Sequence, residues 1–214
     1  MSTARKKIER RKKARKKLNE LAAHEELVLV IHYPCESFYD RPEGQTPRVT
    51  SIAVRNYESG QTDSFSIHKV AELKHVDFSD ITNNYDMLEK EMLAEFYEFM
   101  KQHKNYDWVH WNMRDINYGF PALEHRFKIL GGEPYILDDA KKVDLSRVLV
   151  AIYGNAYTSH PRIGSLMNLN HITAKDQLDG QGEADAFENK EYVKLHQSTL
   201  RKVDVFSDFL GVLS

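Results

Sequence analysis

Four side chains of this sequence combine the residue types that can hold a transition metal. They are one histidine and three carboxylates, His32, Glu36, Asp115 and Asp204. A histidine together with carboxylates can bind manganese, iron or zinc, provided that the chain brings them together at the ends of strands. The alternative interpretation is that His32 is a core histidine with satisfied hydrogen bonds and that Glu36 is solvated.

Cys35 lies three residues after His32, and a cysteine beside a histidine can act as a nucleophile. Pro34 stands between them and no orienting group is evident, so an inert thiol is the favoured interpretation. As the single cysteine, Cys35 also excludes an internal disulfide framework and a cysteine-rich zinc site. This cysteine usage is typical of a reducing compartment, and we expect a cytoplasmic protein.

Aromatic residues gather between positions 106 and 120. Aromatic faces can stack on unpaired bases, but alternating aromatic residues on a strand more often belong to the core. We expect Trp108 and Phe120 to lie in the core. Trp111 and Tyr118 are the candidates for exposed residues that contact nucleic acid.

Positive charge is concentrated at the N-terminus of a chain whose net charge is −2. Residues 1–17 hold ten Lys or Arg and one Glu, whereas the remaining residues hold 20 basic and 31 acidic side chains. The basic residues are Arg5, Lys6, Lys7, Arg10, Arg11, Lys12, Lys13, Arg15, Lys16 and Lys17. A basic arm on an acidic body is typical of an interaction tail, and phosphate contact with RNA or DNA would make its binding sensitive to salt.

Two other partners for this arm remain open: an acidic surface of another protein, or the acidic body of a second copy. A solvated helical tail is the remaining interpretation. No apolar run approaches the roughly 20 residues that a membrane span needs, so we expect no membrane partner.

The hydrophobic pattern divides the chain into a basic helical arm, residues 1–24, and one domain, residues 25–214. The arm is predicted to be helical over 4–23, with an apolar stripe too thin to pack deeply (Ile8, Leu18 and Leu21). Residues 27–31 read as a strand buried on both faces, and the segments 49–54 and 62–68 as a hairpin.

The rest of the chain alternates strands and helices. A fourth strand is predicted within 106–112, and helices over about 86–103, 121–130, 144–153, 163–170 and 189–213. Asp86 is expected to cap the first of these helices, with Glu89 as its capping-box partner. Residues 174–184 are expected to form a loop.

Four segments, in this order, resemble the DEDD 3'-5' exonuclease superfamily. They are the strand 28–31 with its hairpin, Trp111-Asn112 with 118–131, 143–145 with 165–170, and Gly182-Glu183 with the helix that carries Asp204. The resemblance covers about residues 25–210. It implies an α/β, ribonuclease H-like fold: a mixed five-stranded sheet, antiparallel in strands 1–3 and parallel thereafter, flanked by helices.

In that superfamily four acids bind two divalent metals, which activate a water and stabilise an in-line displacement. The resemblance retains one of these acids, Asp204 on the last helix. His32 and Pro34 stand where the first strand should carry its acidic pair, and Gly119 where the second motif should carry its Asp. Asp115 is nearby, but on an inserted loop.

The general base of the superfamily, a Tyr or a His, is also missing from its expected place. The resemblance puts Leu200 and Thr199 at these positions, and neither can act as a base near neutral pH. His196 lies a further turn away.

We therefore predict a degenerate exonuclease-like pseudoenzyme, without a cofactor, that binds nucleic acid or acts as a scaffold. A second hypothesis is an active 3'-5' exonuclease that uses Mg²⁺ or Mn²⁺ at relocated ligands, chiefly Asp204 and Asp115, helped by Glu36 or Asp144. A third is a protein-interaction subunit, or a self-associating one, with no role in nucleic-acid binding.

Overall fold

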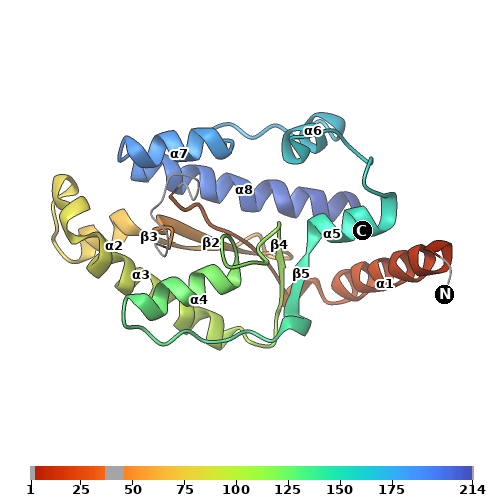
Figure 1. Cartoon of the computed structure of the whole chain (residues 1–214), viewed down its shortest axis with the longest axis horizontal. Helices are drawn as coiled ribbons and strands as arrows, with labels where there is room; N and C mark the ends of the chain where they lie inside the picture. The colour runs from red at the N-terminus through yellow and green to blue at the C-terminus, as the bar shows by residue number, and fades with distance from the viewer. Residues whose placement is uncertain (1–2, 37–45, 214) are drawn as a thin grey trace.

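A computed structural model describes residues 3–36 and 46–213 of the chain. They form an α/β fold around one mixed sheet of five strands, in the order β3-β2-β1-β4-β5 (Figure 1). The strands are β1 (Val28–His32), β2 (Ser51–Asn56), β3 (Thr62–Ser66), β4 (Asp107–His110) and β5 (Lys142–Asp144). The mixed five-stranded sheet flanked by helices, as predicted, is confirmed.

Strand direction changes at β1, in the middle of the sheet. It pairs antiparallel with β2 and parallel with β4, while β2–β3 is antiparallel and β4–β5 is parallel. The sequence did not locate β5, because its three residues are too few for a period-two pattern to show.

Helices cover both faces of the sheet (Figure 1). The helices are α1 (Thr3–Ala23), α2 (Ile67–Leu73), α3 (Tyr85–Gln102), α4 (Phe120–Ile129), α5 (Leu145–Tyr153), α6 (Arg162–Leu169), α7 (Gly180–Glu188) and α8 (Tyr192–Leu213). Short 3-10 helices cover Glu25–Leu27, Phe78–Asp80, Thr82–Asn84 and Asp139–Lys141.

The continuous apolar residues of β1 contribute to the hydrophobic cores on both faces of the sheet. Leu29 and Ile31 belong to the core shared with α3 and α4, whereas Val28 and Val30 belong to the core shared with α1, α5 and α8. Successive strand residues point to opposite faces, so a strand buried on both sides needs apolar residues without interruption.

The C-terminal half of α1 packs against the domain, and the N-terminal half extends beyond it (Figure 1). Ala14, Leu18 and Leu21 are buried in the core that includes α5, whereas Ile8 is 58% exposed. The predicted helix is confirmed. The prediction that it would not pack deeply is wrong for its last three turns, because Ala14 joins the two leucines at helical spacing.

Three local predictions need correction. The segment after β3 turns into α2 at Ile67, whereas the strand was expected to continue to residue 68. The N-cap of α3 is Asn84, not Asp86. Glu89 is fully buried and accepts hydrogen bonds from Arg126, so it has no part in a capping box.

The loop predicted over 174–184 ends earlier than expected, because α7 begins at Gly180. Asp179 caps this helix by accepting a hydrogen bond from the backbone N–H of Gly182 at 2.8 Å. Residues 37–45, between the predicted strands 27–31 and 49–54, lie outside the described residues. None of the helices in the described ranges is long and apolar enough to cross a membrane.

Candidate functional site

The four residues considered as candidate metal ligands do not form a shared site. Asp204 forms an ion pair with Arg55 of β2 at 3.2 Å, and Asp115 accepts hydrogen bonds from two backbone N–H groups of its own loop. Glu36 accepts a hydrogen bond from the backbone N–H of Arg48. Across residues 3–36 and 46–213, no group of three or more His, Cys, Asp or Glu side chains is arranged to hold a metal ion.

The end of β1 instead holds a buried polar cluster, which we call the β1-end cluster: His32, Tyr118, Glu183 and Lys202. Glu183 of α7 accepts a hydrogen bond from the Lys202 ammonium at 2.5 Å, and its Oε1 lies 3.8 Å from His32 Nε2. The Tyr118 hydroxyl lies 3.1 Å from His32 Nδ1. The side chains of His32, Glu183 and Lys202 are 8%, 12% and 6% exposed.

The geometry of α8 explains why Lys202, and not Asp204, reaches this cluster. Ser198, Lys202 and Phe206 follow one another at intervals of four residues and share one face of the helix. The Phe206 ring contacts His32 with 5.7 Å between centroids, so this face looks toward β1. Asp204 lies two residues, or about 200°, around the helix from Lys202, and it therefore points toward Arg55.

The protonation states of the cluster follow from burial and charge. Burial lowers the pKa of His32, an effect that Glu183 opposes and Lys202 reinforces. Burial alone would raise the pKa of Glu183, but contact with His32 and the charge of Lys202 outweigh it and lower that pKa. The cluster is thus a carboxylate paired with an ammonium beside a neutral imidazole.

The Tyr118 hydroxyl lies 3.1 Å from both the backbone carbonyl oxygen of Tyr33 and His32 Nδ1. A phenol has only one proton, so the direction of its contact with His32 follows the tautomer of the imidazole. The other ring nitrogen of His32, Nε2, faces Glu183. This nitrogen is buried without a hydrogen-bond partner among the described residues.

The chemistry of these donors does not suit a pair of divalent cations. A two-metal site needs several carboxylate oxygens to neutralise and hold both ions. The β1-end cluster offers one carboxylate, and an ammonium already neutralises it. An ammonium in this position would also repel an arriving cation.

Gly119 cannot be replaced by an acid in this backbone. Its φ is +143°, and a Cβ built on it would lie 2.2 Å from the carbonyl carbon of Met113. An isolated bridge between Arg114 and Gly119 closes the loop over this close approach. The residue expected to align with the second-motif Asp is therefore a glycine for steric reasons.

The aromatic candidates lie mostly inside the molecule. Trp111 is 7% exposed and stacks on Phe206 at 5.6 Å, so the expected exposure of this residue is wrong. Tyr118 is half-buried and stacks on Tyr33 at 4.7 Å. Trp108 and Phe120 are buried, as predicted.

A second polar cluster lies where β4 and β5 end, and its carboxylate is also neutralised. Asp144 caps α5 by accepting a hydrogen bond from the Ser146 backbone N–H, and it forms an ion pair with Arg114 at 3.1 Å. Burial lowers the pKa of the neighbouring His110 to about 4. Asp144 therefore stabilises the start of α5 and does not join Asp204 or Asp115.

The basic residues of α1 other than Lys17 are exposed, and most of the basic residues form no ion pair with a described residue. Ion pairs join Arg5 to Glu9 and Lys16 to Glu20 within the helix, and Lys17 of α1 to Asp107 of β4. Seven others form no ion pair with a described residue: Lys6, Lys7, Arg10, Arg11, Lys12, Lys13 and Arg15. Helical spacing distributes these side chains around the N-terminal half of α1.

Sequence reasoning missed the role of Lys202, which lies within the Leu-Arg-Lys-Val run of the last helix, and of Glu183. The only signal was the apolar stripe of that helix, which places Lys202 next to buried Val203. No protein-family model matches the chain, and comparisons with curated proteins and with solved structures gave no match.

Proposed function

We propose that this chain is a catalytically degenerate, ribonuclease H-like domain of the 3'-5' exonuclease type that binds RNA or DNA through α1. The direction pattern of the sheet supports the fold assignment, because strands β1–β3 are antiparallel and β1, β4 and β5 are parallel. The resemblance in sequence implies the same pattern.

The proposed loss of catalysis depends on one observation, the Lys202–Glu183 ion pair at the end of β1. Metal-assisted phosphodiester cleavage depends on cations held where the attacking and leaving oxygens will lie. An ammonium bound to the protein has no open coordination position for a water or a phosphate. The charge of Lys202 compensates the buried Glu183 carboxylate and cannot activate a nucleophile.

The exposed cations of α1 support the nucleic-acid role. Outside residues 1–17 the chain carries 11 more acidic than basic side chains, which disfavours a phosphate backbone over most of the surface. Phosphate contacts release counterions, so affinity falls steeply with salt in proportion to the number of contacts. The arm is the part of the chain that can supply several such contacts.

Binding of a labelled oligonucleotide over a range of salt concentrations tests this role. Replacing Lys6, Arg10, Arg11 and Lys13 with Gln should weaken binding strongly and lower the salt slope by about one unit for each phosphate that the variant no longer binds. A matched control replaces the exposed Lys90, Lys101, Lys104 and Lys128 with Gln and should keep the wild-type slope. Equal binding by both variants would contradict the proposal.

An end-labelled substrate with Mg²⁺ or Mn²⁺ tests the loss of catalysis. We expect the protein to bind the substrate without shortening it. Shortening that Asp204→Asn abolishes would instead favour an active exonuclease with relocated ligands. If the arm variant changes the size of the protein in solution but not its nucleic-acid binding, a protein-interaction role is the better account.

A further inference from the structure

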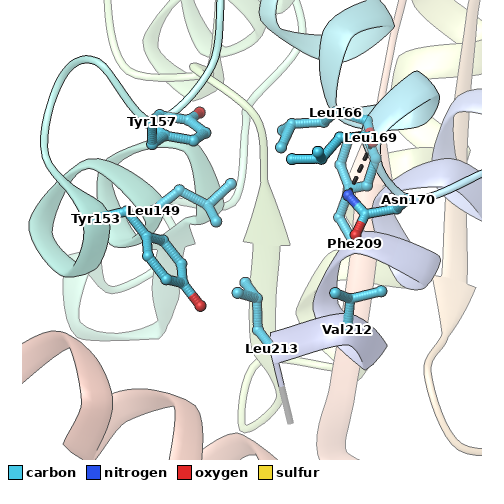
Figure 2. Close-up of a pocket in the computed structure, with 9 residues that line it drawn as sticks. All are labelled: Leu149, Tyr153, Tyr157, Leu166, Leu169, Asn170, Phe209, Val212 and Leu213. Carbon is cyan, nitrogen blue, oxygen red and sulfur yellow. Dashed lines mark hydrogen bonds between the residues drawn. The ribbon is translucent and has the colours of Figure 1, made fainter.

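An apolar pocket of about 400 Å³ opens between α5, α6 and the C-terminal end of α8 (Figure 2). Three aromatic side chains line it: Tyr153 at the end of α5, Tyr157 in the following loop and Phe209 of α8. Leucine and valine side chains complete the walls, and Leu169 and Val212 remain 66% and 60% exposed. The pocket therefore presents apolar surface that the described chain does not cover.

We propose that this pocket binds an unpaired nucleobase of a single strand whose phosphates contact α1. This inference rests on the proposed function. It adds that the nucleic acid is single-stranded and that one of its bases occupies the pocket. Four features of the pocket support it: its aromatic walls, its polar groups, its neighbouring cation and its position beside α1.

The aromatic walls suit the face of a base. Tyr153 is 59% exposed, so a ligand can reach its ring without displacing packed side chains. Figure 2 shows Tyr153 and Tyr157 on the side opposite Phe209 and Leu169, with the hollow between them. Bases of every type stack on aromatic side chains, and this stacking tolerates different sequences.

Polar groups at the wall suit the edge of a base. The Asn170 amide nitrogen donates to the Leu166 carbonyl at 2.8 Å (Figure 2), which leaves one N–H and the amide oxygen for a ligand. An amide that offers a donor and an acceptor can pair with a base edge. The Tyr157 hydroxyl is buried and has no hydrogen-bond partner among the described residues.

A cation stands beside the pocket. The Arg162 guanidinium lies over the Tyr157 ring, 5.3 Å from its centroid, and one of its terminal nitrogens donates to the Asn155 carbonyl at 3.2 Å. Arginine binds phosphate through several N–H groups in one plane. Arg162 is therefore placed to contact the phosphate of a nucleotide whose base occupies the pocket.

The position of α5 links the pocket to the basic helix. Leu149 and Tyr153 of α5 line the pocket, and Leu149 also shares a core with Ala14 and Leu18 of α1. Figure 1 shows α1 and α5 next to each other, with the C-terminus close to α5. A strand that follows the cations of α1 can thus reach the pocket next to α5.

Phe209 also links the pocket to the β1-end cluster. Its ring lies 6.3 Å from that of Phe206, and Phe206 contacts His32. The pocket and the cluster therefore lie on the same face of the sheet.

Fluorescence anisotropy with three labelled 12-mers tests the proposal: single-stranded DNA, single-stranded RNA, and an abasic strand with the same number of phosphates. The wild-type chain should bind the base-bearing strands about tenfold more tightly than the abasic one. Tyr153→Ala with Asn170→Ala should remove this preference and leave the salt slope unchanged. The control Leu73→Ala changes an exposed apolar residue of α2 and should keep the preference.

The variants separate this inference from the proposed function. The four-residue α1 variant should lose affinity for all three strands in parallel. Pocket variants that keep the wild-type preference would overturn the pocket proposal, while a loss of binding in the α1 variant would still support the arm. A mononucleotide could instead compete with all three strands, including the abasic one. That result would assign the pocket to a free nucleotide and overturn the proposal that it binds a base of a single strand. An apolar helical peptide that displaces the strands at the pocket would assign it to a protein partner.

Discussion

Positive charge occurs in two contrasting settings in this molecule, the β1-end cluster and α1. Lys202 is 5% exposed and forms a close pair with Glu183, whereas seven cations of α1 are exposed and form no ion pair with a described residue. A charge that leaves water needs a partner, while an exposed charge is stabilised by solvent. The buried ammonium is therefore committed to the fold, and the exposed cations remain available for phosphate.

The largest effect should come from breaking the buried pair. Lys202→Met keeps the length of the apolar stem but leaves Glu183 as a buried, uncompensated carboxylate. We expect a loss of about 3–5 kcal/mol in the free energy of unfolding, measured by chemical denaturation. Adding Glu183→Gln should recover much of this loss, because the remaining groups are then uncharged.

Lys194→Met is the matched control for this change. Lys194 lies on the same helix and pairs with Glu191, but its side chain is 51% exposed. Its substitution should alter the free energy of unfolding by less than about 0.5 kcal/mol. Equal effects at positions 194 and 202 would show that burial does not distinguish these two lysine–glutamate pairs.

The next effect concerns the two halves of α1. Leu18 is 6% exposed and packs in the core with α5, whereas Ile8 is 58% exposed on the extended half. Leu18→Ala should therefore cost about 2–3 kcal/mol of unfolding free energy, and Ile8→Ala less than about 0.5 kcal/mol. A large effect at Ile8 would show that the N-terminal half is also held against the domain.

The sequence predicts the architecture well wherever apolar residues repeat over a long segment. The last helix is predicted over 189–213, and its apolar residues, including Tyr192, Leu195 and Val203, are buried. The continuous apolar run of β1 correctly indicates a strand buried on both faces. These signals are local, because spacing along one segment decides which side chains share a face.

The sequence does not predict α7, because long-range contacts outweigh the local signal. Gly180 and Gly182 favour a loop by propensity. The helix forms where Asp179 caps it, Ala186 is fully buried and Glu183 pairs with Lys202, which is 19 residues away in the chain. The same limit applies to the β1-end cluster, whose members come from β1, α7, α8 and a loop.

A smaller effect should appear in the pH dependence of stability. Burial lowers the pKa of His196 to about 4, and the charge of Lys69 reinforces this effect. The unfolded chain has a pKa near 6.5 and takes up the proton first as the pH falls. Stability is therefore full above pH 6.5 and is lost between 6.5 and 4, by about 1 kcal/mol over the first unit from His196 alone.

Thermal unfolding between pH 7.5 and 5 checks this prediction. His196→Gln can keep the hydrogen bond that now joins the imidazole to Ser64, at 2.9 Å, and should reduce the pH dependence by the contribution of His196. The control His125→Gln changes an exposed residue of α4 and should keep the wild-type slope. A wild-type slope in His196→Gln would assign the acid sensitivity to other groups, such as His32 and His110, whose pKa values burial also lowers.

The smallest effect on stability should come from two ion pairs that involve α1, one with β4 and one within the helix. Lys17 and Asp107 join the helix to β4 at 2.8 Å with side chains 27% and 21% exposed, whereas Arg5 and Glu9 are 68% and 51% exposed. Asp107→Asn should cost up to about 1 kcal/mol at low salt, and Glu9→Gln no measurable amount, because solvent screens the exposed pair. Denaturation at low and high salt would measure both. If Glu9→Gln also strengthens nucleic-acid binding while Asp107→Asn does not, the two halves of α1 differ in function as they do in packing.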